Sequence, residues 1–367
     1  QVEPHRTLGP RPPPRALAEP LEAWTAMAPV APLPPLRVHK TIGGGAGPLD
    51  CAIGAMIHCV CWGGGMFLGP LLLFSPASFL VISFRKAAAL TGVTAMLAFL
   101  PPLRESPLFC KVFLRAAALM KGGSTLWVAD EVLPHLGDGL MVCYHPHGVI
   151  PLGFTLNGAI RAKTGLPKDY LPPEAQLNSR VNGVQAPVLF KIPILRQILQ
   201  LFGCSTPATK QGMLGLLKRQ MTFGIIIGGS EEVALQVCGR ERLFLRGRAG
   251  FMKYALQHGT KLVIAYNYGE SDLYTNVEAL RSFNLWLVRT FGFVLPLFWG
   301  RWWCPLLPRG DVPLNTVFGK VMELPKIEEP TVEQVAEWHG RYVEALQGVF
   351  DAYKEQFGYG ERTLEIL

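Results

Sequence analysis

Two histidines close together carry the clearest chemical signal in this sequence. They stand in the tetrapeptide His145-Pro146-His147-Gly148, directly after the apolar run Leu140–Tyr144. A loop at the end of a strand holds its side chains rigidly and leaves them accessible, so active-site groups are frequent there. Imidazole also has an ordinary pKa that suits proton transfer near neutral pH.

Two histidines on one turn fit three kinds of chemistry. A metal site is disfavoured, because no further ligands follow at a usual spacing. A structural turn remains open. The third reading is a general base, in which one neutral imidazole accepts a proton from a hydroxyl and a partner fixes its tautomer.

A second motif follows the apolar strand predicted over Gly224–Ile227. Here Gly228 and Gly229 precede Glu231 and Glu232. The glycines let a substrate approach the main chain, and their amides can hold an oxyanion or a phosphate. A carboxylate here can orient an imidazole from a neighbouring strand. The alternative is a solvated helix start, where glutamate is favoured anyway.

A third group of polar residues surrounds the strand predicted over Leu262–Tyr266. Before it, Arg248 stands next to a predicted helix N-terminus, which is a typical cradle for an anion. After it come Gly269 and Glu270, so this strand also ends in a glycine and a carboxylate.

Two possible nucleophiles are disfavoured. Ser230 lacks the final glycine of the G-x-S-x-G elbow of hydrolases. Cys143 belongs to a predicted strand and is expected to point into the core. The eight cysteines form no C-x-x-C pair and are predicted to be reduced and mostly buried.

Strands that alternate with helices predict an α/β fold with a largely parallel sheet covered on both faces. Ligands bind at the carboxyl ends of the strands in such sheets. A capping box at Thr331 marks the start of the last helix, and His339 is expected at the edge of the core. The other helices are predicted over Leu108–Met120, Val188–Phe202, Lys210–Met221, Gly250–His258 and Val277–Phe291.

The N-terminal third is expected to meet a membrane. Residues 51–84 contain no Asp, Glu, Lys or Arg, and a membrane-spanning helix needs about 20 residues. Arg85 and Lys86 interrupt an apolar pattern that continues to Leu100. Two spanning helices, a re-entrant hairpin and a buried pair of core helices all fit. The net charge of +8 comes from scattered residues, which favours lipid head groups or a phosphorylated substrate over nucleic acid.

Three segments follow from these patterns. Residues 1–48 are rich in proline and alanine and are predicted to be a disordered tail, with a glycine-rich hinge at 43–47. Residues 49–106 are predicted to form a membrane hairpin. Residues 107–367 are predicted to form the enzyme domain that holds the three motifs.

Taken together, the motifs resemble the type-2 diacylglycerol acyltransferase family, which includes monoacylglycerol acyltransferases and wax synthases. Residues 144–148 are similar to its Y-[FH]-P-H-G signature, 228–232 to its G-G-x-x-E block and 248–251 to its R-x-G-F block. The family's Tyr-Phe-Pro element after the membrane segment is missing. Related glycerolipid acyltransferases use H-x-x-x-x-D, but Ile150 and Leu152 stand where that aspartate would be.

The resemblance implies a fold and an activity. The fold is a glycerolipid-acyltransferase-like mixed, largely parallel sheet flanked by helices, preceded by a membrane-embedded hydrophobic helical hairpin. The activity is acyl transfer from acyl-CoA, as co-substrate, to diacylglycerol, with no cofactor and no metal. Monoacylglycerol or a long-chain alcohol is the alternative acceptor, and a non-catalytic lipid-binding protein is the alternative of another class. The expected location is the endoplasmic reticulum membrane or lipid droplets, with most of the chain cytosolic, and a homo-oligomer stays open.

The resemblance also implies roles for residues. His147 is the base, with His145 as the second choice, and Glu232 steadies the imidazolium. Amides of Gly148 or of Gly228 and Gly229 stabilise the oxyanion. Arg248 meets the coenzyme A phosphates. The other residues predicted to bind substrate are Pro146, Gly250, Phe251, Gly269 and Glu270.

Overall fold

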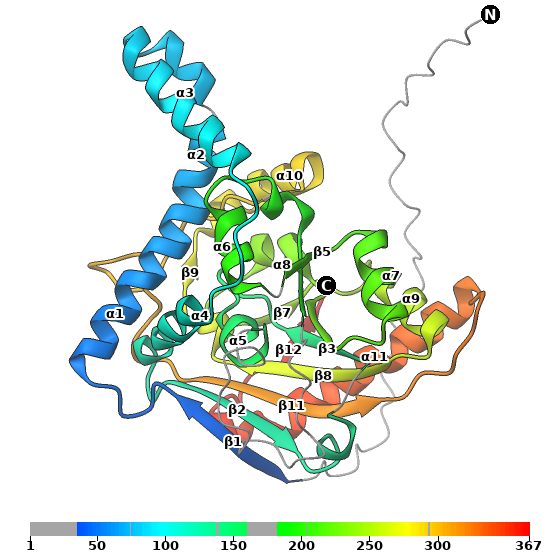
Figure 1. Ribbon diagram of the computed structural model, residues 1–367. Coiled ribbons are helices and arrows are strands. Elements are labelled where there is room, and N and C mark those ends of the chain that lie inside the picture. The colour runs from blue at the N-terminus through cyan, green and yellow to red at the C-terminus, as the bar shows by residue number, and fades with distance from the viewer. Residues whose placement is uncertain (1–34, 74, 137–138, 160–181, 204, 293) are drawn as a thin grey trace, which may run out of the picture. The chain divides into compact units, whose positions relative to one another are not determined.

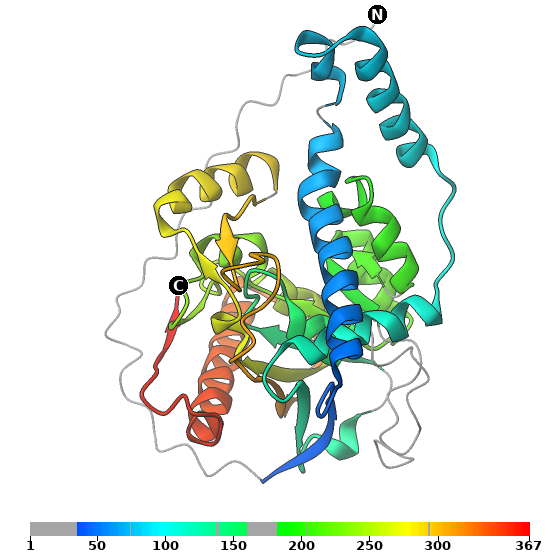
Figure 2. The same cartoon turned by 90° about the vertical axis from the view of Figure 1, so that its left-hand side faces the viewer.

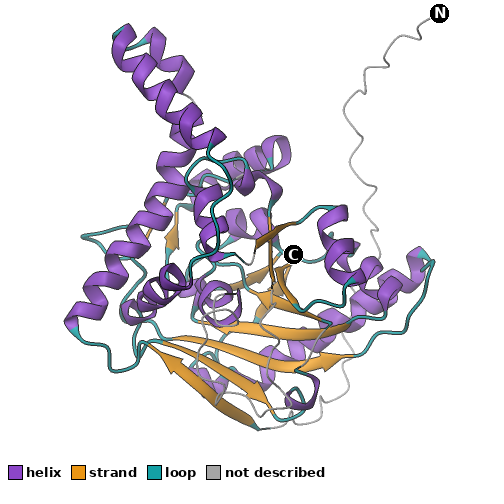
Figure 3. Cartoon of the chain, in the orientation of Figure 1, coloured by secondary structure: helices purple, strands orange, loops and turns teal. Residues whose placement is uncertain are grey.

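The computed structural model describes residues 35–367 apart from 74, 137–138, 160–181, 204 and 293. Its centre is an eight-stranded sheet with the order β1-β2-β11-β8-β3-β6-β4-β5 (Figures 1 and 3). The strands from β8 to β5 are parallel, β11 runs antiparallel to β8 and parallel to β2, and β1 is antiparallel to β2. The bounds are β1 Leu36–Ile42, β2 Ser124–Ala129, β3 Leu140–His145, β4 Asn182–Gln185, β5 Ser205–Pro207, β6 Phe223–Ile226, β8 Lys261–Tyr268 and β11 Leu314–Met322.

The three predicted strands are confirmed as β3, β6 and β8. They are neighbours, because β3 pairs with β8 on one side and with β6 on the other. All three run parallel, so their carboxyl ends meet at one edge of the sheet. The three motifs found in the sequence therefore lie together, and the largely parallel sheet is confirmed.

The helices agree with the prediction best where the end signals were strong. The helix predicted over Gly250–His258 is found with those bounds, and the last helix begins after Thr331 with the predicted capping box. Val188–Phe202 was predicted as one helix, but Ile194 adopts φ 68° and separates a short 3-10 turn from α6. Pro193 explains the break, since α conformation is disfavoured for the residue before a proline.

Three more predicted helices are shorter than expected, because 3-10 turns replace one of their ends or the chain leaves the helix early. The bounds are α1 Pro48–His58, α2 Gly69–Leu73, α3 Phe84–Phe99, α4 Pro107–Leu114, α5 Leu152–Phe154, α6 Leu195–Phe202, α7 Lys210–Lys218, α8 Gly229–Leu235, α9 Gly250–His258, α10 Arg281–Phe291 and α11 Val332–Tyr353. Two small sheets pair β9 Thr275–Asn276 with β10 Phe298–Trp299 and β7 Glu241–Leu243 with β12 Leu364–Ile366.

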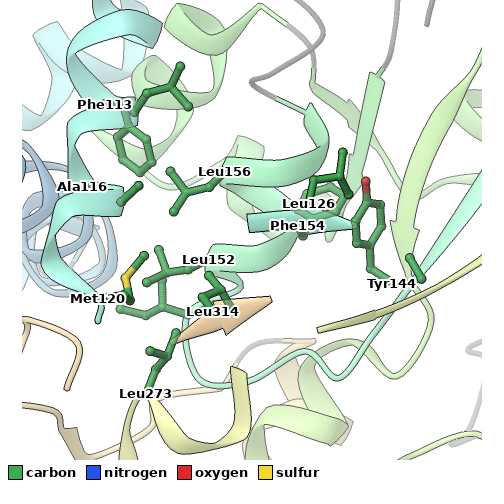
Figure 4. Packing of buried hydrophobic residues seen from close by; sticks show 14 of the residues in the cluster. Phe113, Ala116, Met120, Leu126, Tyr144, Leu152, Phe154, Leu156, Leu273 and Leu314 are labelled. Carbon is green, nitrogen blue, oxygen red and sulfur yellow. The ribbon is translucent and has the colours of Figure 1, made fainter. Parts of the chain in front are cut away.

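Hydrophobic cores cover both faces of the sheet. Along β3, Met141 and Cys143 join one buried cluster, and Val142 and Tyr144 join the other, as the alternation of side chains along a strand requires. Figure 4 shows the second cluster, where Tyr144 lies beside Phe154. The strand that carries the two histidines is therefore held from both sides.

Part of the tail predicted to be disordered has regular structure. Residues 1–34 lie outside the described residues, but Leu36–Ile42 form β1, which pairs with β2. Main-chain hydrogen bonds to the open edge of β2 give this segment partners that composition alone does not reveal. Gly43 and Gly45 then turn the chain into α1, both with positive φ.

The apolar run forms one long helix followed by a reversal. Helix α1 continues through a π-helical segment, Cys59–Leu68, into α2. The helical stretch Pro48–Leu72 has the length and composition to cross a membrane. Helix α3 then turns back beside α2 (Figures 1 and 2), where Thr94 Oγ1 donates a hydrogen bond to the Leu72 carbonyl over 3.3 Å. Insertion of this hairpin into a bilayer stays a prediction.

Candidate active site

His147 lies just beyond the end of β3 and lines an apolar cavity. Its Nδ1 is 3.0 Å from the Gly148 carbonyl oxygen. A carbonyl can only accept, so Nδ1 carries the hydrogen and Nε2 keeps its lone pair. Burial lowers the pKa of His147 to about 4, so the imidazole is neutral at pH 7. These are the properties of a general base.

His145 has a different environment. It is fully buried, its Nε2 lies 2.6 Å from the Tyr342 hydroxyl, and burial lowers its pKa to about 3. It is not among the residues that line the cavity. Tyr342 belongs to α11 and packs against Phe251, with ring centroids 5.2 Å apart. The structure thus separates the two candidate bases, with His147 at the cavity and His145 behind it.

Glu232 is buried next to the same loop. Its Oε1 accepts a hydrogen bond from the main-chain N–H of His147 over 2.5 Å, and its Oε2 accepts from the N–H of Phe244 over 2.9 Å. The sequence predicted a contact with the imidazole, but both carboxylate oxygens bind main-chain amides instead. Glu232 therefore positions His147 through its backbone. Burial raises the pKa of Glu232 to about 7, against the opposing effect of these two hydrogen bonds and of Arg248.

Glu270 is the counterpart of Glu232 on the other side of the loop. Its two oxygens accept hydrogen bonds from the N–H groups of Leu152 over 2.8 Å and Gly153 over 2.6 Å. Burial raises the pKa of Glu270 to about 8. Gly148 follows the histidines and adopts a φ of 64°. A Cβ at this position would lie 2.8 Å from Glu270 Cγ. Only glycine fits this position.

The remaining predicted residues lie around this loop. Gly229 lines the cavity, and Gly228 precedes it at the start of α8. Pro146 follows a cis peptide bond, and Gly269 leads from β8 to Glu270.

The residues of the R-x-G-F block support the loop but do not line the cavity. Arg248 forms an ion pair with Glu231, and its guanidinium lies 5.4 Å from the ring centre of Phe244. Gly250 opens α9, and Phe251 supports Tyr342. None of these residues lines the cavity, so a direct contact between them and a substrate stays a prediction.

The cavity also contains residues that the sequence did not single out. Cys61, Trp62 and Met66 come from the π-helical segment, and Leu195 and Ile198 come from α6. Tyr342 was missed in the same way, because its spacing marked it only as part of a packed helix face. Nothing local in the sequence indicates which distant side chain will reach a histidine.

The two disfavoured nucleophiles differ in position. Cys143 is fully buried, and burial raises the pKa of its thiol to about 12, as expected for a core residue. Ser230 lines the cavity. The described cysteines are free, and Cys204 lies outside the described residues.

A family model described as "Diacylglycerol acyltransferase" matches residues 135–367, which is more than half of the chain. The chain belongs to this family. The matched segment holds both histidines of the H-P-H-G loop, Glu232, Glu270 and the R-x-G-F block.

Several curated proteins of this kind are similar to the chain. Diacylglycerol O-acyltransferase 1 of Eremothecium gossypii is 36% identical over 253 residues, which are 66% of this chain and 53% of that protein. Acyl-CoA wax alcohol acyltransferase 1 of Homo sapiens is 33% identical over 230 residues, 59% of this chain and 67% of that protein. Diacylglycerol O-acyltransferase 2 of Xenopus tropicalis is 33% identical over 240 residues, which are 61% of this chain and 63% of that protein. The chain thus spans between about half and two thirds of the length of these relatives.

The comparison with solved structures gives a match as well. It is the 1-acyl-sn-glycerophosphate acyltransferase PlsC from Thermotoga maritima, with a TM-score of 0.36 and 13% sequence identity. The match covers 82% of this chain and 95% of that chain.

Proposed function

We propose that this chain transfers a fatty acyl group from acyl-CoA to the hydroxyl of diacylglycerol and so forms triacylglycerol. One observation carries the proposal: a neutral imidazole, fixed in one tautomer, lines an apolar cavity. Membership of the diacylglycerol acyltransferase family supports the same reaction. A protein that only binds lipid needs no such base.

In this reaction His147 Nε2 takes the proton of the acceptor hydroxyl while the hydroxyl oxygen attacks the thioester carbonyl. The new C–O bond gives a tetrahedral oxyanion. Its collapse breaks the C–S bond, and the coenzyme A thiolate leaves and takes the proton from the imidazolium. The base is restored, and no covalent enzyme intermediate is needed.

Two further roles belong to the proposal. Amides at Gly148, or at Gly228 and Gly229, stabilise the oxyanion, an effect worth roughly 3–4 kcal/mol for one donor. Arg248 meets the coenzyme A phosphates, which requires that it leave or share its ion pair with Glu231. The hydrogen bonds of Glu232 and Glu270 keep the loop in place throughout.

We also propose that the end of the hairpin, around its reversal, inserts into the membrane of the endoplasmic reticulum or the surface of lipid droplets. The helical stretch Pro48–Leu72 supports this by its length and composition. Around the reversal, Leu80, Val81 and Phe84 expose most of their apolar surface. Such a patch is costly in water and favourable in lipid. The site would then open close to the phase that dissolves diacylglycerol.

The test is an assay of the full chain in microsomes with labelled oleoyl-CoA and a panel of acceptors. We expect labelled triacylglycerol from wild type and none above background from His147→Ala at equal expression. If labelled product forms only from monoacylglycerol or only from a long-chain alcohol, that lipid is the acceptor in place of diacylglycerol. The alcohols are included because the chain is similar to a wax alcohol acyltransferase. No labelled ester with any acceptor would contradict acyl transfer.

A further inference from the structure

The cavity next to His147 is almost entirely apolar. Apart from His147, its described lining consists of aliphatic and aromatic side chains, glycine, one cysteine and a few neutral hydroxyl and amide groups. No Asp, Glu, Lys or Arg is among the described residues that line it. Such a space cannot hold phosphates or a sugar, but it suits a hydrocarbon chain.

One wall of this cavity comes from the apolar helix. Cys61, Trp62 and Met66 of the π-helical segment line it, next to Leu195 and Ile198 of α6. A segment whose composition suggests only a membrane anchor therefore also shapes the space in front of the base.

This wall is firmly attached to the domain. A Cβ on Gly65 would lie 2.9 Å from Leu195 Cδ1, so the helix backbone packs directly on α6. Seven residues earlier, the buried His58 has its Nε2 2.9 Å from the Tyr274 hydroxyl and 3.0 Å from the Leu306 carbonyl oxygen. Close packing on one side and hydrogen bonds on the other fix the position of Cys61 and Met66 relative to His147.

We infer that the segment Cys61–Met66 forms one wall of a binding site for a long acyl chain, and that Met66 limits the chain length that fits. The inference rests on the proposed function and adds a subsite to it. Met66 is suited to this role because its side chain is unbranched and adapts to the shape of its neighbours. The chain can belong to the acyl-CoA donor or to the glycerolipid acceptor, which share this chemistry.

The test compares Met66→Trp with Leu68→Trp in the full chain in membranes. Both variants add the same indole to the same helix, but Leu68 is 47% exposed and does not line the cavity. Rates are measured with acyl-CoA donors of 8 to 20 carbons at one acceptor, and then with diacylglycerols of varied chain length at one donor. We expect Met66→Trp to lower the ratio of long-chain to short-chain rates by about tenfold or more, since one misfitting methylene in an apolar pocket already has such an effect. Leu68→Trp should leave the ratio as in wild type.

The two series identify the source of the chain. A shift confined to the donor series assigns the wall to the thioester acyl group, and a shift confined to the acceptor series assigns it to the glycerolipid. Equal profiles for both tryptophan variants would overturn the inference.

A second measurement does not depend on turnover. A fatty acyl-CoA with a diazirine at the end of its chain is added to the full protein in membranes and activated by light. Labelling within residues 61–66 supports the wall, and labelling that leaves this segment unmarked contradicts it. If the protein transfers no acyl group at all, the proposed function fails while the labelling still decides whether this cavity takes an acyl chain.

Discussion

Glu232 and Glu270 occupy the two sides of the H-P-H-G loop and make similar hydrogen bonds with different consequences. Each is buried, and each accepts from two main-chain amides. Glu232 binds the amide of His147 itself, whereas Glu270 binds amides beyond the loop, at Leu152 and Gly153. Arg248 lowers the pKa of Glu232, while only hydrogen bonds oppose the effect of burial on Glu270. One carboxylate thus fixes the backbone of His147, and the other fixes the turn that follows it.

The largest effect is expected where the base itself is removed. His147→Ala should lower kcat by about 10²–10⁴-fold, the usual contribution of a positioned general base. The thermal unfolding midpoint should stay close to that of wild type, because the side chain partly faces the cavity. If the variant keeps most of its activity at equal expression, the base lies elsewhere, and the difference between the two carboxylates loses its meaning for catalysis.

Glu232→Gln should have the next largest effect on catalysis. The new NH₂ group faces a main-chain N–H, and a lost buried hydrogen bond of this kind costs roughly 1–3 kcal/mol. Because one of the two amides belongs to His147, part of this cost should appear as a fall in kcat of about tenfold, with KM for acyl-CoA little changed. A change in KM alone would show that Glu232 acts in substrate binding and not in positioning.

Glu270→Gln should destabilise the protein by a similar amount but affect kcat less. The same loss of a hydrogen bond applies, roughly 1–3 kcal/mol, but it falls on Leu152 and Gly153. Denaturation midpoints and kcat measured side by side for the two glutamine variants test the comparison directly. Equal losses of kcat at equal stability would remove the distinction between them.

The smallest expected effect concerns pH. Burial raises the pKa of Glu232 to about 7 and of Glu270 to about 8, above the ordinary 4.5. A group whose pKa is raised by folding contributes stability that is complete below its unfolded pKa and is lost as pH rises through the folded value. The unfolding midpoint of wild type should therefore fall between about pH 4.5 and 8. In Glu270→Gln the fall should be shallower and its part between pH 7 and 8 should be absent, and a curve parallel to wild type would assign the titration to another group.

Much of this arrangement was predictable from local patterns. The strands that end at His145, Ile226 and Tyr268 follow from apolar runs before glycines, and parallel pairing places their ends together. The capping box at Thr331 predicted the start of α11. Each of these signals lies within a few residues of the feature that it predicts, which is why it could be read from the sequence.

Other features depend on partners that are distant in the sequence. Glu232 was expected to contact the imidazole, but its oxygens bind main-chain amides. The orientation of α8 relative to β3 determines which groups the carboxylate reaches. Tyr342 reaches His145 from a helix that begins almost 190 residues later, as their separation of 197 residues shows. Composition predicted disorder for Leu36–Ile42, because composition gives no information on the open edge of β2 with which this segment pairs.

Gly148 and Gly153 both face the Glu270 carboxylate at distances that leave no room for a side chain. A side chain at either position would push the Glu270 carboxylate away from the loop, whereas part of the cavity wall comes from α6 and the π-helical segment, which carry ordinary side chains. Substitutions in these two helices can therefore change the shape of the cavity and leave the hydrogen bonds around His147 in place.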